Sequence, residues 1–108
     1  MPEFNELCFG SRVIKLEFID KDLANKKKIF GEFDSDKNQI TLDNSLDNIQ
    51  MINTIIHECF HMMHDEYKIE ISAKAEELVC NSLANGLCHI LYQNQNLLEL
   101  LYKSLKKE

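Results

Sequence analysis

The organisation of the chain follows from one stretch, Ile52-Asn53-Thr54-Ile55-Ile56-His57-Glu58-Cys59-Phe60-His61-Met62-Met63. Its apolar residues recur at helical spacing, and the Asp, Asn and Ser residues between positions 43 and 47 are good N-cap candidates, so a helix is predicted here. Side chains four positions apart lie on one face of a helix. His57 and His61 can therefore reach a single metal ion, with Glu58 beside the first of them.

The pattern His57-Glu58-x-x-His61 contains the residue types that zinc-dependent hydrolysis requires. Two imidazoles hold the metal, and the adjacent carboxylate is the general base toward a water that the metal activates. The alternative is a pair of histidines that bind no metal, in which case an unpaired Glu58 on a partly buried helix would cost stability. The motif predicts His57 and His61 as zinc ligands and Glu58 as the catalytic base.

A catalytic zinc site usually has three protein ligands and a water, so a third ligand must come from elsewhere in the chain. The candidates are the other histidines and the acids downstream of the motif: His64, His89, Asp65, Glu66, Glu70, Glu76 and Glu77. His64 lies about 10 Å from His57 along the helix axis, at about 1.5 Å per residue. We expect His64 near the metal or facing a substrate, with an ordinary surface position as the alternative.

A second amphipathic helix is predicted from Glu76 onward. Its apolar face contains Val79, Cys80, Leu83, Ala84, Leu87, Cys88 and Leu91. Both Glu76 and Glu77 fall within the arc of this face, where a carboxylate needs an ionic partner or a metal. Helix phase does not choose between them and places Glu76 slightly nearer the centre. Stabilisation of first-turn acids by the helix dipole is the alternative explanation.

A family resemblance starts at the same residues. The run Glu77-x-x-Cys80-Asn81-x-Leu83-Ala84 resembles the segment E-x-x-A-[ND]-x-F-A that follows HExxH in zinc metallopeptidases of the gluzincin type. The resemblance implies that Glu77 is the third zinc ligand and that Asn81 supports the site.

More widely, residues 38–98 resemble the small metallopeptidase-like proteins of phages and mobile elements that are related to the ImmA/IrrE peptidases. Those proteins have a strand that ends in Asp, here residues 40–43, then the HExxH helix, then E-E-x-V-x-x-L-A-x-G-L, here residues 76–87. The resemblance covers over half of the chain. It departs at Cys80, where Ala or Val is usual, and at His64, where an apolar residue is usual.

The function expected from the motif and the resemblance is hydrolysis of a peptide bond in a peptide or protein substrate. Tyr67 and His64 follow the metal helix and are candidates for a second electrophile. Two other classes stay open. One is a zinc-binding regulatory or phage–host interaction protein that keeps the site without cleaving a substrate. The other is a binding module whose zinc is structural, with His64 or Cys80 as a fourth ligand.

The composition narrows the class of protein. The 108 residues are expected to form one domain, and the apolar fraction of 44% predicts a folded globule. The net charge of −6 argues against nucleic-acid binding. The chain has no apolar run of membrane-spanning length and no signal-peptide pattern, so a cytoplasmic protein is expected, in the host cytoplasm if a phage encodes it. The four cysteines form no CxxC pair and are expected to be reduced.

The remaining segments predict an α+β fold. Strands are expected at residues 12–19, 28–33 and 39–42, with a turn or short helix at 20–25 and a turn at 34–38. The fold class is therefore a small antiparallel sheet of about three strands, packed on the HExxH helix, the Glu-bearing helix and a short C-terminal helix.

The C-terminal helix is expected after a break at residues 93–96. Its apolar residues are Leu97, Leu98, Leu100, Leu101 and Leu105. The simplest interpretation is that these leucines cover the core, and a homodimer contact is the alternative.

Overall fold

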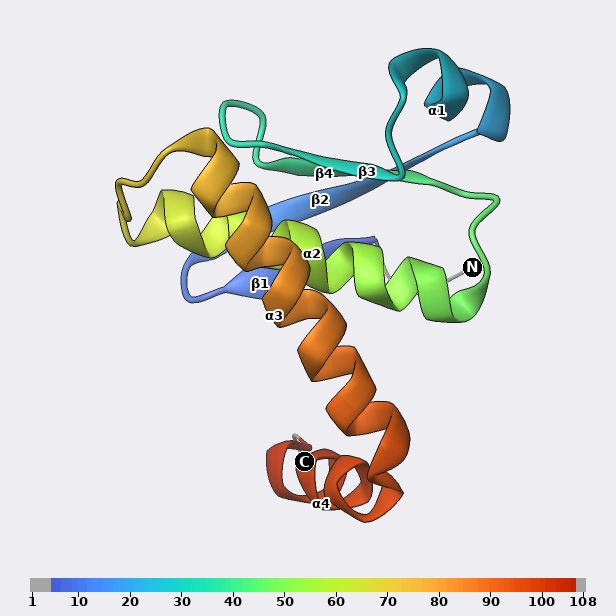
Figure 1. Ribbon diagram of the computed structural model, residues 1–108, viewed down its shortest axis with the longest axis vertical. Helices are drawn as coiled ribbons and strands as arrows, with labels where there is room; N and C mark the ends of the chain where they lie inside the picture. The colour runs from blue at the N-terminus through green and yellow to red at the C-terminus, as the bar shows by residue number, and fades with distance from the viewer. Residues whose placement is uncertain (1–4, 107–108) are drawn as a thin grey trace.

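The computed structural model describes residues 5–106 and shows an α+β fold, as the sequence predicted (Figure 1). Its elements are β1 (Glu6–Phe9), β2 (Arg12–Ile19), α1 (Lys21–Lys27), β3 (Gly31–Asp34), β4 (Gln39–Asp43), α2 (Asn48–Glu66), α3 (Ala73–Gln93) and α4 (Gln95–Leu105). The predicted order, an N-terminal sheet followed by three helices, is confirmed. Within residues 5–106, no helix combines the length and the apolar character that crossing a bilayer requires.

The sheet has four strands in the order β1-β2-β4-β3. β3 and β4 form an antiparallel hairpin around the predicted turn, in which the carboxylate of Asp34 accepts the N–H groups of Asp36 and Lys37. Two details of the prediction are corrected: β1 adds a fourth strand, and β2 pairs with β4 in parallel. Parallel strands need a crossover connection, which α1 and the reversed strand β3 supply together.

The bounds of three elements also differ from the predictions, and one of them is α4, which begins at Gln95, inside the break expected at residues 93–96. The strand expected to begin at residue 28 begins only at Gly31, because Lys28 adopts a left-handed conformation (φ 58°) and ends α1. This left-handed position is the usual C-terminal cap of a helix. The Glu-bearing helix begins at Ala73, because the hydroxyl of Ser72 accepts the N–H of Ala75 and caps the first turn.

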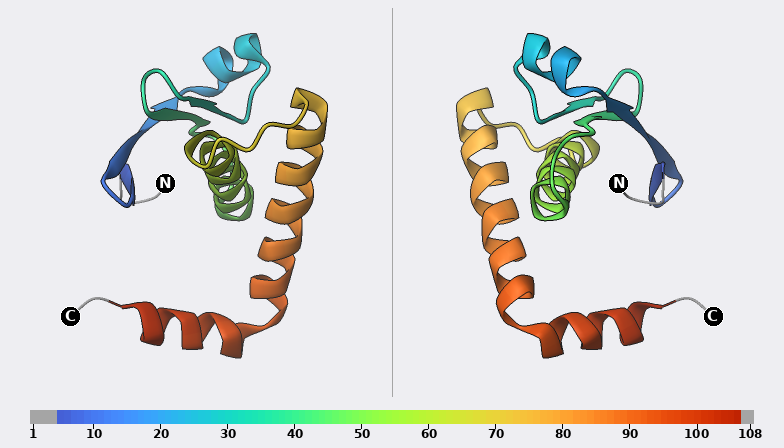
Figure 2. Two further views of the ribbon diagram at one scale, coloured as in Figure 1. Left: turned by 90° about the vertical axis from the view of Figure 1, so that its left-hand side faces the viewer. Right: turned by 90° about the vertical axis from the view of Figure 1, so that its right-hand side faces the viewer.

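The domain has three layers, namely the sheet, α2 and α3. Figure 2 shows α2 nearly end-on between the sheet and α3. The core lies between β2, β4 and α2 and consists of Ile14, Leu16, Ile40, Leu42, Met51, Ile55 and Met62. Because the buried stripe of α2 faces the sheet, one flank of this helix is free to present polar side chains toward α3 and β3.

The prediction that α4 covers the core was wrong. The main contact of α4 is with α3, and Figure 2 shows it at the far end of α3, away from the sheet. The five leucines that were expected to cover the core are each between 38% and 75% exposed. The reason is the length of α3, which runs unbroken to Gln93 and carries α4 beyond the core.

Candidate functional site

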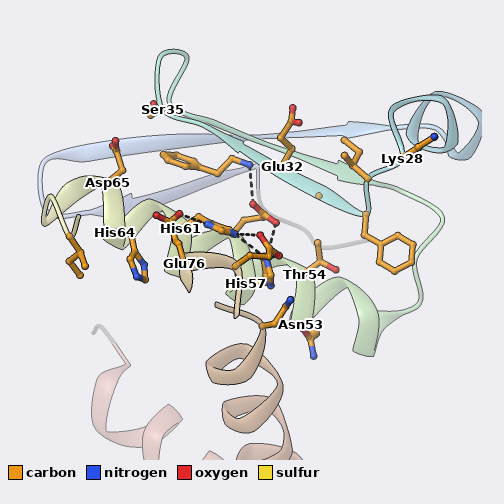
Figure 3. Close-up of a pocket in the computed structure, with 18 of the residues that line it drawn as sticks. Lys28, Glu32, Ser35, Asn53, Thr54, His57, His61, His64, Asp65 and Glu76 are labelled. Atoms are coloured by element: carbon orange, nitrogen blue, oxygen red, sulfur yellow. Dashed lines mark hydrogen bonds and ion pairs between the residues drawn. The ribbon is translucent and has the colours of Figure 1, made fainter. Parts of the chain in front are cut away.

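The HExxH motif lies in the middle of α2, where the backbone is fully helical. The start of the helix is fixed by a capping box, in which Asp47 accepts the N–H of Gln50 and the side chain of Gln50 accepts the N–H of Asp47. A single stripe, Met51, Ile55, Glu58 and Met62, is buried. His57 and His61 lie beside this stripe, and Figure 3 shows both of them directed into the space between α2 and α3.

α3 brings two carboxylates to these histidines. Cys80 and Ala84 are completely buried on the side of α3 that carries Glu77, where α3 packs against α2. Two small side chains at this crossing allow the helices to approach closely. One polar contact joins the helices further along, since the amide of Asn53 donates to Asn85 at 2.8 Å. The first turn of α3 therefore lies over the HExxH motif.

His57, His61 and Glu77 bring three donor atoms together. The Nε2 atoms of the two histidines are 3.1 Å apart. Glu77 places Oε1 at 3.0 Å from Nε2 of His57 and Oε2 at 3.1 Å from Nε2 of His61. A tetrahedral zinc with bonds of about 2.0–2.1 Å holds its donors roughly 3.3 Å apart. The three side chains thus fit a zinc ion, and within residues 5–106 they are the one group of three or more His, Cys, Asp or Glu residues with this convergence.

Glu76 contacts the same histidine through its other ring nitrogen. Its Oε2 atom lies 2.6 Å from Nδ1 of His61, and the side chain is 28% exposed. A metal-binding histidine normally donates its second N–H to such a carboxylate, which fixes the ring orientation and the tautomer. Glu76 and Glu77 therefore have different partners on one imidazole. The sequence did not reveal this role of Glu76, although its place in the apolar arc indicated that it needed a partner.

Glu58 is held between α2 and β3. It is 6% exposed, and its Oε1 atom accepts the N–H of Phe33 at 3.0 Å. Its other oxygen, Oε2, lies 3.8 Å from Nε2 of His57. Burial raises the pKa of Glu58 above its usual range, and the charge of His61 and the N–H of Phe33 counter part of this rise. The sequence predicted the carboxylate but not the backbone donor, because β3 comes from a distant part of the chain.

The charges around the two histidines are strongly negative. Burial lowers the pKa of His57, and the charge of Glu77 opposes this effect in part. Burial alone would lower the pKa of His61 as well, but the hydrogen bond that its ring donates to Glu76 and the nearby carboxylates raise this pKa overall. Three carboxylates surround two imidazoles, and a divalent cation would offset this excess of negative charge.

A groove of about 1260 Å³ opens over these residues. It runs between α2, the first turn of α3, and the segment from the end of α1 into β3, and Figure 3 shows the side chains that line it. Glu32 and Phe33 line it from β3, and Asn81 lines it from α3. The groove places a substrate-sized space beside the three donor atoms.

The other candidates occupy different places. His64 lines the groove, but its Nδ1 atom lies 2.8 Å from the carbonyl oxygen of Phe60 and 3.9 Å from Sγ of Cys80, so it is not among the three converging donors. Tyr67 ends α2 and packs its ring edge-on against Phe9 at 5.7 Å, outside the groove lining.

Three further candidates for the third ligand lie away from the histidine pair. Asp65 and Glu66 form ion pairs with Arg12, at 2.8 and 3.0 Å. His89 is exposed on α3, three turns beyond Glu77. None of these three belongs to the converging group, and neither does Glu70, which lines the groove. Glu76 and Glu77 are the acids that contact His61.

No family model, curated protein or solved structure matches the chain. The assignment of the site therefore depends on the residues and the geometry described above.

Proposed function

We propose that this protein is a zinc-dependent peptidase in which His57, His61 and Glu77 hold the metal and Glu58 is the general base. The observation that supports this best is the convergence of two histidines and one carboxylate group. The Nε2 atoms of His57 and His61 are 3.1 Å apart, and Oε1 and Oε2 of Glu77 lie 3.0 and 3.1 Å from them, next to the buried carboxylate of Glu58. Three protein ligands leave one position for water, which is the arrangement of catalytic zinc sites, whereas structural sites are closed by four protein ligands. Neither His64 nor Cys80 belongs to the converging group.

Each residue has a distinct part in the proposed reaction. Bound zinc supplies Lewis acidity, which lowers the pKa of water and polarises the scissile carbonyl. Oε1 of Glu58 is anchored by the N–H of Phe33, so Oε2 is the oxygen that accepts a proton from the attacking water and passes it to the leaving amine. Glu76 holds the ring of His61 in the orientation that presents Nε2 to the metal.

The surroundings of the site favour a peptide as the substrate. β3 is an edge strand of the sheet, and its residues Glu32 and Phe33 line the groove. An extended peptide can pair with an exposed edge strand through main-chain hydrogen bonds. Such pairing would lay the peptide along β3, through main-chain groups other than the N–H of Phe33, which Glu58 already accepts. The peptide backbone would then pass Glu58, His57, His61 and Glu77.

The test compares the wild-type chain with Glu58→Gln, using Glu32→Gln as a matched control that also removes a carboxylate from the groove. Zinc affinity is measured by competition with a chromophoric chelator, and cleavage is measured on a peptide library by mass spectrometry. We expect Glu58→Gln to bind zinc and to lose at least about 100-fold in turnover, because general bases typically contribute 10²–10⁴-fold. Glu32→Gln should keep turnover, and any effect should appear in KM, because Glu32 lies on the strand that would pair with the peptide.

Three results would count against the proposal. Full turnover in Glu58→Gln would exclude its role as the base, and failure of the wild-type chain to bind zinc would exclude the metal site. Tight zinc binding without cleavage of any peptide or protein offered would favour the other interpretation, a zinc-binding regulatory or interaction protein that keeps a peptidase-like site.

A further inference from the structure

The C-terminal part of the chain forms a projecting helical arm, defined here as residues 83–93 of α3 together with α4. Figure 2 shows this arm turning through a sharp corner below α2. Ten of its large apolar side chains are between 38% and 75% exposed. Tyr92 lies on the side of α3 opposite to Leu83, and the other nine are Leu83, Leu87, Ile90, Leu97, Leu98, Leu100, Leu101, Tyr102 and Leu105. On α3 three of these residues recur at spacings of four and three. On α4 the polar residues Gln95, Asn96, Glu99 and Lys103 share one face, and the rest of the helix surface is apolar apart from Ser104.

α4 has little within the chain to stabilise it. It is an 11-residue helix whose main contact is with α3, and its N-cap residue Asn94 makes no side-chain capping bond. Helices shorter than about 12–15 residues are marginal in water without tertiary packing. Contact with α3 covers only part of the apolar surface of α4, since even the least exposed leucines of α4 remain 38% exposed. A further surface is therefore needed to cover α4.

We propose that the helical arm is a self-association surface and that a second copy of this chain covers it in a two-fold symmetric dimer. The available area matches such an interface. A fully exposed large apolar side chain offers on the order of 100 Å², so nine that are about half exposed offer roughly 500 Å² of apolar surface. Homodimer interfaces are about 65% apolar, which makes the total close to the roughly 800 Å² per partner of a stable complex.

The distribution of charge also favours a second copy. The chain as a whole carries a net charge of −6, but residues 83–106 contain only Glu99, Lys103 and Lys106 as charged side chains. Glu99 and Lys103 pair within α4 at 2.8 Å, on its polar face. Two arms can therefore meet without the like-charge repulsion that the acidic globular part would cause. Helices that bind membrane surfaces carry many Lys and Arg residues on the polar face, which α4 does not.

The experiment measures the mass of the full chain in solution by light scattering and by sedimentation over a range of concentrations. We expect a species of twice the 12.6 kDa monomer mass. Leu105→Glu changes the most exposed leucine of α4, at 75%, so it should leave the monomer fold intact and weaken dimerisation at least tenfold. Leu101→Glu is the second variant. Ile49→Glu, in which the wild-type side chain is 66% exposed at the start of α2 and outside the arm, is the matched control and should remain a dimer.

Circular dichroism and zinc affinity show whether each variant keeps the domain fold, because the site lies outside the arm. The inference would be overturned by a wild-type chain that stays monomeric at high micromolar concentration, or by a dimer that survives both leucine variants. Dissociation by Ile49→Glu would place the interface elsewhere and would also overturn it. A monomer that sediments with phosphatidylcholine–phosphatidylserine vesicles would show that the arm binds lipid instead.

Discussion

Glu76 contacts Nδ1 of His61, whereas Nε2 of the same ring is the atom that faces His57 and Glu77. A change at Glu76 therefore tests how the His61 ring is oriented without removing one of the three proposed zinc ligands. The contact is short, 2.6 Å, and only 28% of the Glu76 side chain is exposed. If Glu76 were removed, a water molecule would therefore be a poor substitute for its carboxylate. Loss of such an outer partner of a metal-binding histidine typically costs 10–100-fold in metal affinity. This corresponds to about 1.4–2.8 kcal/mol of binding free energy.

The magnitude depends on which property of Glu76 is removed. Glu76→Gln keeps a hydrogen-bond acceptor but removes the charge, whereas Glu76→Ala removes both. We therefore expect zinc affinity to fall in the order wild type, Glu76→Gln, Glu76→Ala. Glu77→Ala should bind zinc most weakly of all, because it removes one of the three donors. Glu32→Gln removes a charge from the same groove without touching a histidine and should stay close to wild type.

The assay is competition for zinc with a chromophoric chelator near neutral pH, on variants whose circular dichroism matches the wild-type chain. Two outcomes would refute the reasoning. If Glu76→Ala bound zinc as tightly as wild type, the short contact with Nδ1 would have no role in holding the metal. If Glu76→Ala lost more affinity than Glu77→Ala, the two acids would have exchanged roles, and Glu76 would be the ligand.

Two further predictions concern packing and thiol chemistry. A Cβ at Gly31 would lie 2.5 Å from Cγ2 of Thr54, between β3 and α2, so Gly31→Ala should lower the free energy of unfolding by about 1–3 kcal/mol in urea denaturation. A Cβ at Gly86, in the middle of α3, meets no atom within 4 Å, so Gly86→Ala should raise the free energy of unfolding by about 0.5–1 kcal/mol. If both variants changed the free energy of unfolding in the same direction, the packing described here would be contradicted. Burial, followed by the charges of nearby carboxylates, raises the pKa of Cys80 to about 11. Because only the thiolate reacts, Cys80 should resist a thiol reagent at neutral pH and react faster as the pH rises toward that pKa, whereas the exposed Cys8 should react at once; rapid labelling of Cys80 in the folded chain would show that α3 separates from α2.

α2 was predictable from the sequence because everything that defines it is local. The capping box is complete within four residues, Asp47 to Gln50, and the buried stripe repeats every three or four positions. The pairing of β2 with β4 is not local in this sense. It depends on the path of the roughly twenty residues between the two strands, which contain α1 and β3. Alternation of apolar and polar residues within a strand carries no information about the direction of the neighbouring strand.

The acids of α3 show why helix phase could not choose between them. A choice assumes that one carboxylate is used and the other is solvated, yet both contact His61, one at each ring nitrogen. Adjacent residues on a helix are about 100° apart, which is enough to reach two sides of one imidazole. The family pattern directed attention to Glu77, while the apolar arc indicated Glu76, and the geometry gives each of them a contact.

The error at α4 has a different physical origin. Amphipathic spacing shows that a helix has an apolar face, but it does not identify the surface that covers the face. In a domain of 108 residues the core is the nearest candidate. Only the straight course of α3, which crosses α2 and continues beyond it, removes α4 from the core, and no residue before Asn94 marks that course in the sequence.

α3 connects the site to the arm, and its attachment to the domain is narrow. Two small residues, Cys80 and Ala84, form its buried contact surface, while Glu76 and Glu77 meet the histidines at its first turn. A zinc ion held by donors from both helices would add a strong link at the end of α3 opposite to α4, because a ligand that binds only the folded arrangement stabilises it. The metal site would then fix the direction in which α3 leaves the domain. The orientation of the apolar arm, and with it the geometry of the proposed dimer, would depend on the same contacts that assemble the site.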